Sequence, residues 1–353
     1  MKKYKYLIVG QGLSGTLLAH ILEDRGFSFK IIDTGINNSS AIAAGIINPI
    51  VFRRTTKSWM VDECYPSAIE MYQSLEEKLA VKFLHKRTIR RAFSSEQERD
   101  EWKKKASLSV FKPYINEVSD EAPSYLNQPF GNALVHEACY VDAPVFIESN
   151  RVYFQKNDLL ITAKFNYDSV TESGCSIGEE HFEQIIFCEG YHGLKNPFFN
   201  YLPLTQTKGQ LLSIELDTPI DQSEILNRKC FFLPLENGTY KAGSTYEWDN
   251  ETLHTTEEAK EEIISHIENL IQIPFKIIHQ EAGIRPTVVD RRPLVGRHPA
   301  QNNLFIFNGL GAKGYLLAPY FLTHFAEYLE NKVSLNPEIS IDRVKKKINF
   351  EHN

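Results

Sequence analysis

The chain has 353 residues, enough for one large or two medium-sized hydrophobic cores, and its 42% hydrophobic and 24% charged residues are ordinary for a globular protein. The net charge of −6 argues against a general binder of nucleic acids or acidic membranes. The five cysteines are scattered without a C-x-x-C pair, which indicates reduced thiols in a cytoplasmic protein and neither a disulfide framework nor a zinc site. Because no apolar run approaches 18 residues, we expect no membrane span.

The N-terminal stretch predicts a strand, a glycine turn, a helix and a second strand. An apolar run ends at Gly10, an amphipathic helical pattern follows from Ser14 to about Arg25, and a second apolar run ends at Asp33. In this pattern the first glycine permits a tight turn, Gly12 lets a pyrophosphate approach the backbone, and Gly15 lets the helix pack closely on the sheet. The start of the helix then presents free N–H groups and the positive end of its dipole to the phosphates.

Asp33 completes this pattern. It lies 23 positions after Gly10, close to the spacing of about 20 expected for an acid that bonds the adenosine ribose. A carboxylate here disfavours a 2′-phosphate, so we expect FAD or NAD and not NADP. The alternative is a purely structural glycine turn. Strand, helix and acid all agree with a dinucleotide site, and the neighbouring Leu13, Ser14 and Thr34 belong to it.

The sequence pattern changes between residues 41 and 132. Small residues are dense in 41–45 after a polar loop, which suggests backbone passing close to a flat or charged ligand, although a buried helix start is the alternative. A helix is predicted over 61–79. Residues 83–132 then read as an inserted module, with a strand at 87–91, a charged helix at 96–105 and a loop-rich stretch at 113–129.

The remaining elements alternate between two regions. We predict a strand and a helix from residue 135, a buried strand over 159–163, and an apolar strand over 184–187 that suits a parallel sheet. From residue 203 the chain is predicted to leave the first domain a second time. Short strands are expected at 230–233, 239–242 and 245–248, and a helix over 256–272. A strand at 304–307 then leads into a second glycine-rich turn and a helix over 316–329; such a turn can aim N–H groups at a carbonyl or an anion.

Several short motifs occur in one order along nearly the whole chain. Together they resemble the D-amino-acid oxidase/glycine oxidase family of FAD-dependent amine oxidoreductases, and residues 308–319 look most similar to the oxidase half of the bifunctional enzyme that matures tRNA wobble uridines. The motifs are Gly10-Gln11-Gly12-Leu13-Ser14-Gly15, Ala43-Ala44-Gly45, Ile186-Phe187-Cys188-Glu189-Gly190, Lys208-Gly209-Gln210, Gly243-Ser244-Thr245, Gly283-Ile284-Arg285-Pro286 and Gly309-Leu310-Gly311-Ala312-Lys313-Gly314.

The resemblance implies an α/β fold in which two domains are interleaved. A Rossmann-like FAD-binding domain of the glutathione-reductase type would comprise residues 1–80, 134–202 and 283–353. An α+β substrate domain built on a mixed sheet would comprise residues 81–133 and 203–282. The FAD would be noncovalent, because the segment where sarcosine oxidases carry the linking cysteine reads Ala282-Gly283-Ile284 here. No metal is implied.

The resemblance also assigns site residues. Contacts to FAD would come from Gly10, Gly12, Leu13, Ser14, Gly15, Asp33, Thr34, Ala44, Gly45, Ile46, Phe165, Tyr167, Glu189, Gly190, Gly309, Leu310, Gly311, Ala312, Lys313 and Gly314. Arg285 matches the arginine that binds a substrate carboxylate, and its alternative is a surface or interface arginine. Lys241 falls where sarcosine oxidases carry a lysine that promotes reaction with O2, and its alternative is a solvated strand lysine. Asn48 and Arg53 are further candidates near the flavin.

Three functions follow from this resemblance. The leading hypothesis is an FAD-dependent oxidase or dehydrogenase that oxidises the C–N bond of a small amino acid or N-substituted glycine to an imine, with O2 or another acceptor. The second is removal of a carboxymethyl group from tRNA, for which Arg53, Arg54, Lys57 and Lys313 would form a basic entrance. Only this hypothesis expects a nucleic-acid partner. The third is a flavin-binding module without turnover, and an NAD-dependent dehydrogenase is least favoured. No feature indicates an oligomeric state.

Overall fold

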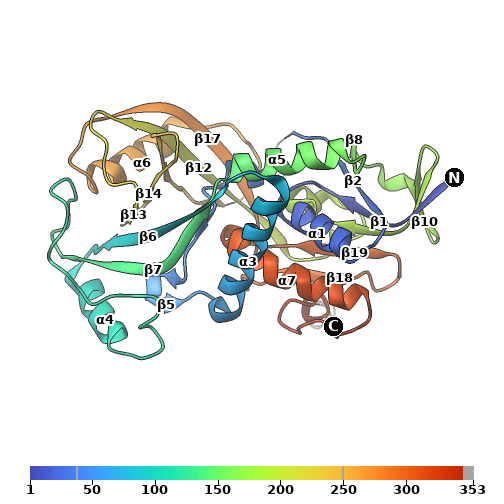
Figure 1. The fold of residues 1–353 in the computed structure, drawn as a ribbon, viewed down its shortest axis with the longest axis horizontal. Helices are drawn as coiled ribbons and strands as arrows, with labels where there is room; N and C mark the ends of the chain where they lie inside the picture. The colour runs from blue at the N-terminus through green and yellow to red at the C-terminus, as the bar shows by residue number, and fades with distance from the viewer. Residues whose placement is uncertain (37–38, 249, 345–353) are drawn as a thin grey trace, which may run out of the picture.

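The structure is a computed structural model that describes residues 1–36, 39–248 and 250–344. It contains two large sheets that lie in different halves of the molecule (Figure 1). The first sheet runs in the order β18-β19-β11-β1-β2-β8, with β9 and β10 added beside β11. Its strands are β1 (Lys2–Val9), β2 (Phe29–Asp33), β8 (Leu160–Thr162), β9 (Val170–Thr171), β10 (Gly174–Ile177), β11 (Glu180–Phe187), β18 (Leu294–Arg297) and β19 (Leu304–Asn308).

The centre of the first sheet is parallel, as predicted. β1 pairs in parallel with β2 and β11, and β11 pairs in parallel with β19. Residues 185–187 of β11 are buried, because helices cover the sheet. The prediction of a buried strand over 159–163 is wrong in its burial: β8 forms the end of the strand order and its three residues are half-buried or exposed.

Four helices complete this half of the molecule. They are α1 (Leu13–Asp24), α3 (Val61–Leu79), α5 (Ala143–Lys156) and α7 (Gly314–Leu329). Helix α7 contacts both α1 and α3, and their apolar faces form one hydrophobic core with the strands beneath them. The predicted bounds of α3 are confirmed to the residue, whereas α7 begins two residues earlier than predicted.

The second sheet is mixed and runs in the order β16-β12-β15-β14-β13-β6-β7-β3, with β17 on the other side of β12. The pairing of β13 with β6 is parallel, and the other pairs are antiparallel. Its strands are β3 (Ile46–Ile47), β6 (Leu84–Ala92), β7 (Asn132–Val141), β12 (Leu204–Leu216), β13 (Glu224–Asn227), β14 (Phe231–Pro234), β15 (Tyr240–Gly243), β16 (Glu247–Trp248) and β17 (Phe275–Val288).

Smaller elements flank this sheet. Helix α6 (Glu257–Glu268) packs on β12 and β15 and shares a core with them, while α4 (Glu96–Ala106) belongs to the predicted inserted module. Helix α6 ends four residues before the predicted bound, and Thr256 caps its start. A short helix α2 (Ser39–Ile42) precedes a small hairpin of β4 (Ile50–Val51) and β5 (Thr56–Lys57).

The division into two interleaved domains stays a prediction. Two of its boundaries, at 133/134 and 282/283, fall inside β7 and β17, and both strands belong entirely to the second sheet. All five cysteines are buried and free. Among the helices that the structure describes, none has the length and apolar character needed to cross a membrane.

Candidate active site

A cavity of about 850 Å³ is lined by residues from both sheets, a volume near the upper end of the range typical of ligand pockets. From the first half of the molecule come the turn after β1, the end of β2 and the start of α7. From the second sheet come apolar side chains that close the other wall. These include Ile89, Leu211, Ile225 and Phe231.

The turn after β1 needs its glycines for steric reasons. Gly10 has φ +103°, and a Cβ there would lie 2.6 Å from the carbonyl oxygen of Cys188. A Cβ at Gly15 would lie 1.9 Å from the carbonyl oxygen of Gly10, so only glycine lets α1 pack this closely. Helix α1 starts after Gly12, which provides no side-chain cap, and has no acid in its first turn; Leu13 N donates to Ser40 Oγ at 3.0 Å, and Gly12, Leu13 and Ser14 line the cavity. Its positive dipole end therefore opens on the cavity, as a phosphate-binding site requires.

Asp33 is held rigidly beside this helix start. Its Oδ2 accepts a hydrogen bond from Gln11 N at 2.8 Å, and its Oδ1 accepts from Gly35 N at 2.6 Å. Arg151 of α5 donates to the same Oδ1 at 3.2 Å. Since an ionised carboxylate has about four lone-pair sites, acceptor capacity remains for a ribose hydroxyl. Sequence reasoning missed Arg151, because no local pattern links it to a residue so far away in the chain.

Four further predicted residues, Phe165, Tyr167, Glu189 and Gly190, line the same cavity. Tyr167 Oη donates to Glu189, and Asn196 Nδ2 donates to the other oxygen of that carboxylate at 2.7 Å. Burial raises the pKa of Glu189 above its usual value. The two aromatic rings meet edge to face at 5.5 Å and give this end of the cavity an apolar wall.

The second glycine-rich turn brings another helix start to the cavity. Asn308 Nδ2 donates to Gly190 O at 2.8 Å, which ties the turn to the end of β11. Leu310 to Gly314 line the cavity, and α7 begins there without a side-chain cap or a first-turn acid. Two helix N-termini without an acid in the first turn therefore open on one cavity. This arrangement suits a ligand that carries negative charge at two separate places.

Lys313 contributes a positive charge in the same place. Its Nζ donates to Ser58 Oγ at 2.6 Å and to Asn48 O at 3.1 Å. Burial lowers the pKa of Lys313 to about 8. The ammonium is thus bound by two neutral acceptors, of which Asn48 lines the cavity and Ser58 does not.

Arg285 projects from β17 across the neighbouring strand. Its Nη2 donates to Ser244 Oγ at 2.7 Å and its Nη1 to Thr245 O at 3.4 Å, while Tyr246 packs against the guanidinium with 4.4 Å to the ring centroid. Burial lowers the pKa of Arg285, although the residue stays charged. No carboxylate among the described residues forms an ion pair with it. The cavity therefore contains a half-buried guanidinium that can receive an anionic group.

Most of the predicted site residues line the cavity. The exceptions are Gly15, Gly309 and Lys241. Gly15 serves the packing of α1, and Gly309 has φ +77° with a would-be Cβ only 2.7 Å from Val288 Cγ2, so it serves the turn. Lys241 is buried, and its Nζ lies 3.8 Å from Glu281 Oε2. Asn48 lines the cavity and Arg53 does not.

The four residues of the expected basic entrance are not gathered at the cavity. Of these, only Lys313 lines it. Lys57 forms an ion pair with Asp62, and Arg53 and Arg54 are exposed on the short turn after β4. The cavity is also lined by residues that were not predicted, among them Ser40, Leu211, Ser244 and Tyr246. Alternation along β12 could have identified Leu211, and the Gly243-Ser244-Thr245 motif could have identified Ser244.

These observations fit FAD as the cofactor. The helix α1 start and Asp33 suit a pyrophosphate and a ribose, and the α7 start suits the polar edge of a flavin ring. The fit is supported by Gly10 and Gly15, because a Cβ added at either position would overlap backbone atoms. In the described part of the chain, no cluster of three or more His, Cys, Asp or Glu residues could hold a metal ion.

The chain is similar in sequence to proteins of known function. The tRNA 5-methylaminomethyl-2-thiouridine biosynthesis bifunctional protein of Campylobacter jejuni (strain RM1221) is 24% identical over 307 residues, which are 84% of this chain and 46% of that protein. The chain thus spans about half the length of this relative. Glycine oxidase of Bacillus licheniformis is 23% identical over 344 residues, 90% of each chain.

The fold and the family are also identified by comparison. The crystal structure of glycine oxidase from Geobacillus kaustophilus superposes with a TM-score of 0.81 at 19% identity, covering 95% of this chain and 96% of the other, which shows a common fold. The sequence profile of the DAO family, described as FAD dependent oxidoreductase, matches residues 5–326. The chain belongs to the DAO family of FAD-dependent oxidoreductases.

Proposed function

We propose that this protein oxidises the C–N bond of an amino acid or N-substituted glycine whose carboxylate binds Arg285. The observation that supports this most is the guanidinium of Arg285, which lies in the cavity without a carboxylate partner among the described residues. A guanidinium binds a carboxylate through two parallel hydrogen bonds, which fixes the orientation of the substrate as well as its position. This geometry supports the proposed substrate class.

Residues on one wall of the cavity would bind the cofactor, and residues on the other wall would bind the substrate. FAD, when bound, accepts a hydride from the carbon beside the nitrogen. Asp33 and the start of α1 would hold its ribose and phosphates, and the N–H groups of 311–314 would stabilise negative charge at its polar edge. Arg285 would orient the substrate, and Leu211, Ile225 and Phe231 would keep water away from the reacting carbon. The imine would leave to be hydrolysed.

A second candidate is oxidative removal of a carboxymethyl group from a modified tRNA uridine. Tyr246 lines the cavity and its side chain is 59% exposed, and Trp248 nearby is 62% exposed. Nucleobases stack on exposed aromatic rings of this kind. A carboxymethylaminomethyl group carries both a carboxylate for Arg285 and an amine for oxidation. The similarity to the Campylobacter jejuni protein favours this candidate, whereas the net charge of −6 does not.

The test is an anaerobic titration of the FAD-loaded protein. Glycine, sarcosine, proline and D-amino acids are added in turn, followed by tRNA that carries carboxymethylaminomethyluridine. Loss of the visible flavin band with a free amino acid supports the first candidate. Bleaching by the tRNA alone supports the second. A flavin that none of these compounds reduces contradicts both.

A further inference from the structure

Residues 244–246 bulge out of the second sheet towards the cavity. The preceding strand β15 pairs with β12 up to Leu211↔Gly243, and the following strand β16 resumes pairing with β12 at Lys208↔Glu247. The bulge therefore lies opposite the middle of β12. Thr245 Oγ1 accepts a hydrogen bond from Gln210 N at 3.0 Å, which attaches the bulge to β12. Ser244 and Tyr246 face the cavity and contact Arg285.

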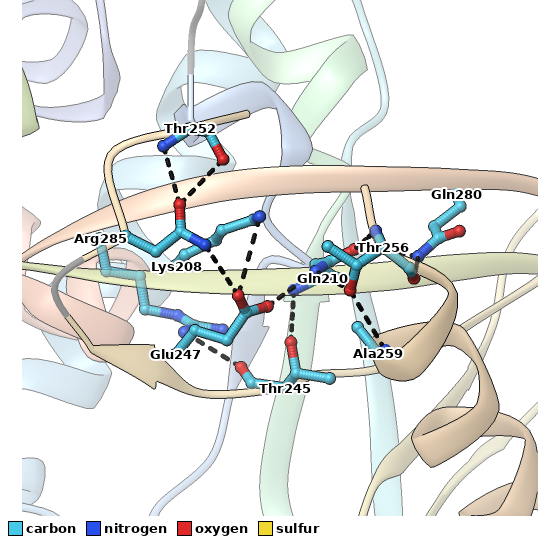
Figure 2. Close-up of polar contacts among 10 residues, drawn as sticks. Lys208, Gln210, Thr245, Glu247, Thr252, Thr256, Ala259, Gln280 and Arg285 are labelled. Atoms are coloured by element: carbon cyan, nitrogen blue, oxygen red, sulfur yellow. Dashed lines mark hydrogen bonds and ion pairs between the residues drawn. The ribbon is translucent and has the colours of Figure 1, made fainter. Parts of the chain in front are cut away.

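Figure 2 shows a polar network next to this bulge. Gly209 and Leu211 of β12 line the cavity whereas Lys208 and Gln210 do not, so the side chains of the latter two point to the opposite face of the sheet. Gln210 is fully buried there and is at the centre of the network. Its Nε2 donates to Glu247 Oε1 at 2.7 Å, and its Oε1 accepts from Thr256 N and Gln280 Nε2, each at 2.9 Å. One amide thus joins β12 to β16, to the cap of α6 and to β17. Its backbone holds the bulge on one side while its side chain holds the network on the other.

A buried charge fixes the same strand. Lys208 is fully buried, and among the residues that the structure describes its Nζ has no hydrogen-bond partner. The Nζ forms an ion pair with Glu247, whose Oε2 lies 3.8 Å away and also accepts from Asn250 Nδ2 at 3.0 Å. A buried ammonium without a neighbouring negative charge is strongly unfavourable. The position of Glu247, which directly follows the bulge, is therefore determined by a charge as well as by the amide of Gln210.

We propose that Lys208, Gln210 and Glu247 are positioning residues for the substrate carboxylate. They hold the 244–246 bulge from behind the sheet, and the bulge holds the guanidinium of Arg285 through Ser244 Oγ and Thr245 O. The inference rests on the proposed role of Arg285. Because the predicted FAD-binding residues come mostly from the first sheet, α1 and α7, disturbing the network should weaken carboxylate binding without loss of FAD.

The experiment measures carboxylate affinity and local order in the FAD-loaded protein. The variants are Glu247→Gln, Lys208→Met and both together, with Glu261→Gln on the exposed face of α6 as the matched control. Acetate and glycolate serve as probes, and their dissociation constants are read from perturbation of the flavin absorption spectrum. Hydrogen exchange of the peptide spanning 240–248 reports the order of the bulge without any ligand.

Glu247→Gln should weaken acetate binding by about tenfold, because it leaves the ammonium of Lys208 unpaired. It should also speed exchange in 240–248 and leave the FAD content unchanged. The double variant should recover most of the affinity, since the uncompensated charge is gone. Glu261→Gln should behave as the unchanged protein. If Glu247→Gln does not fold, Asn250→Ala removes one donor from Glu247 and should act in the same direction, more weakly.

Acetate affinity that is unchanged in Glu247→Gln, while Arg285→Lys weakens it, overturns the inference and leaves the proposed function intact. Unchanged affinity in Arg285→Lys, or no binding of either carboxylate to the unaltered protein, contradicts the proposed function and this inference with it. An equal loss of acetate affinity in Glu247→Gln and in the double variant also overturns the inference, because a merely structural role predicts no rescue.

Discussion

The guanidinium of Arg285 lies against the backbone of Gly209 on the adjacent strand, so close that a Cβ at position 209 would be 2.1 Å from Nη2. Gly209→Ala is therefore expected to displace the guanidinium from Ser244 and to raise KM for a carboxylate substrate by about tenfold or more. Its cross-strand partner offers a comparison, because a Cβ at Gly283 would make only ordinary contacts, the nearest at 3.6 Å. Steady-state kinetics of both variants check this, and an equal effect at the two positions would contradict it.

The pair of Asp33 and Arg151 should matter for FAD affinity. Arg151→Met removes a donor that holds Asp33 at the cavity, so we expect weaker FAD binding, by about tenfold, with little change in the turnover of the saturated enzyme. Reconstitution of the apoprotein with FAD, followed by fluorescence, measures this. Lys5→Met, which breaks an exposed ion pair with Glu183 on the first sheet, is the control and should have no effect.

Lys313 should make the free energy of unfolding rise with pH in the alkaline range. Its folded-state pKa is about 8, below the ordinary lysine value of 10.5. Between these values the unfolded chain holds the proton and the folded chain does not, so this contribution to stability rises with pH across that window. Below about pH 8 both states are charged and the cost of burial is constant.

Lys313→Met removes this cost. The variant apoprotein should be more stable than the unaltered one at about pH 7, and the difference should shrink at about pH 9.5. Urea unfolding at the two pH values measures this. A difference that grows with pH would show that the ammonium is stabilised in the folded protein, against the direction given by its burial.

The local elements of the fold could be predicted from sequence because their signals are local. The glycine spacing, the two apolar runs and the amphipathic helical pattern between them predicted β1, α1 and β2, and the apolar periodicity gave α3 its bounds. The cavity lining at Gly10, at 12–14 and at 310–314 followed from the same two turns, because the free N–H groups of a helix start face its ligand.

The remaining site residues depend on pairing between distant strands. Arg285 meets the bulge only because β12 and β17 pair in the register Thr207↔Arg285, and no periodicity in either strand specifies that register. Lys241 forms an ion pair with Glu281 instead of lining the cavity for a similar reason. The burial of β8 was mispredicted because an apolar run does not reveal whether its strand lies at the edge of a sheet.

The most direct test of the central claim compares an amino acid with the same amine without its carboxylate. Anaerobic reduction of the flavin by sarcosine and by dimethylamine is followed by stopped flow in the unaltered protein and in Arg285→Met. We predict that the unaltered protein prefers sarcosine strongly and that Arg285→Met loses this preference, because the bidentate contact is gone. An undiminished preference for sarcosine in Arg285→Met would contradict the assignment of Arg285 as the carboxylate-binding residue.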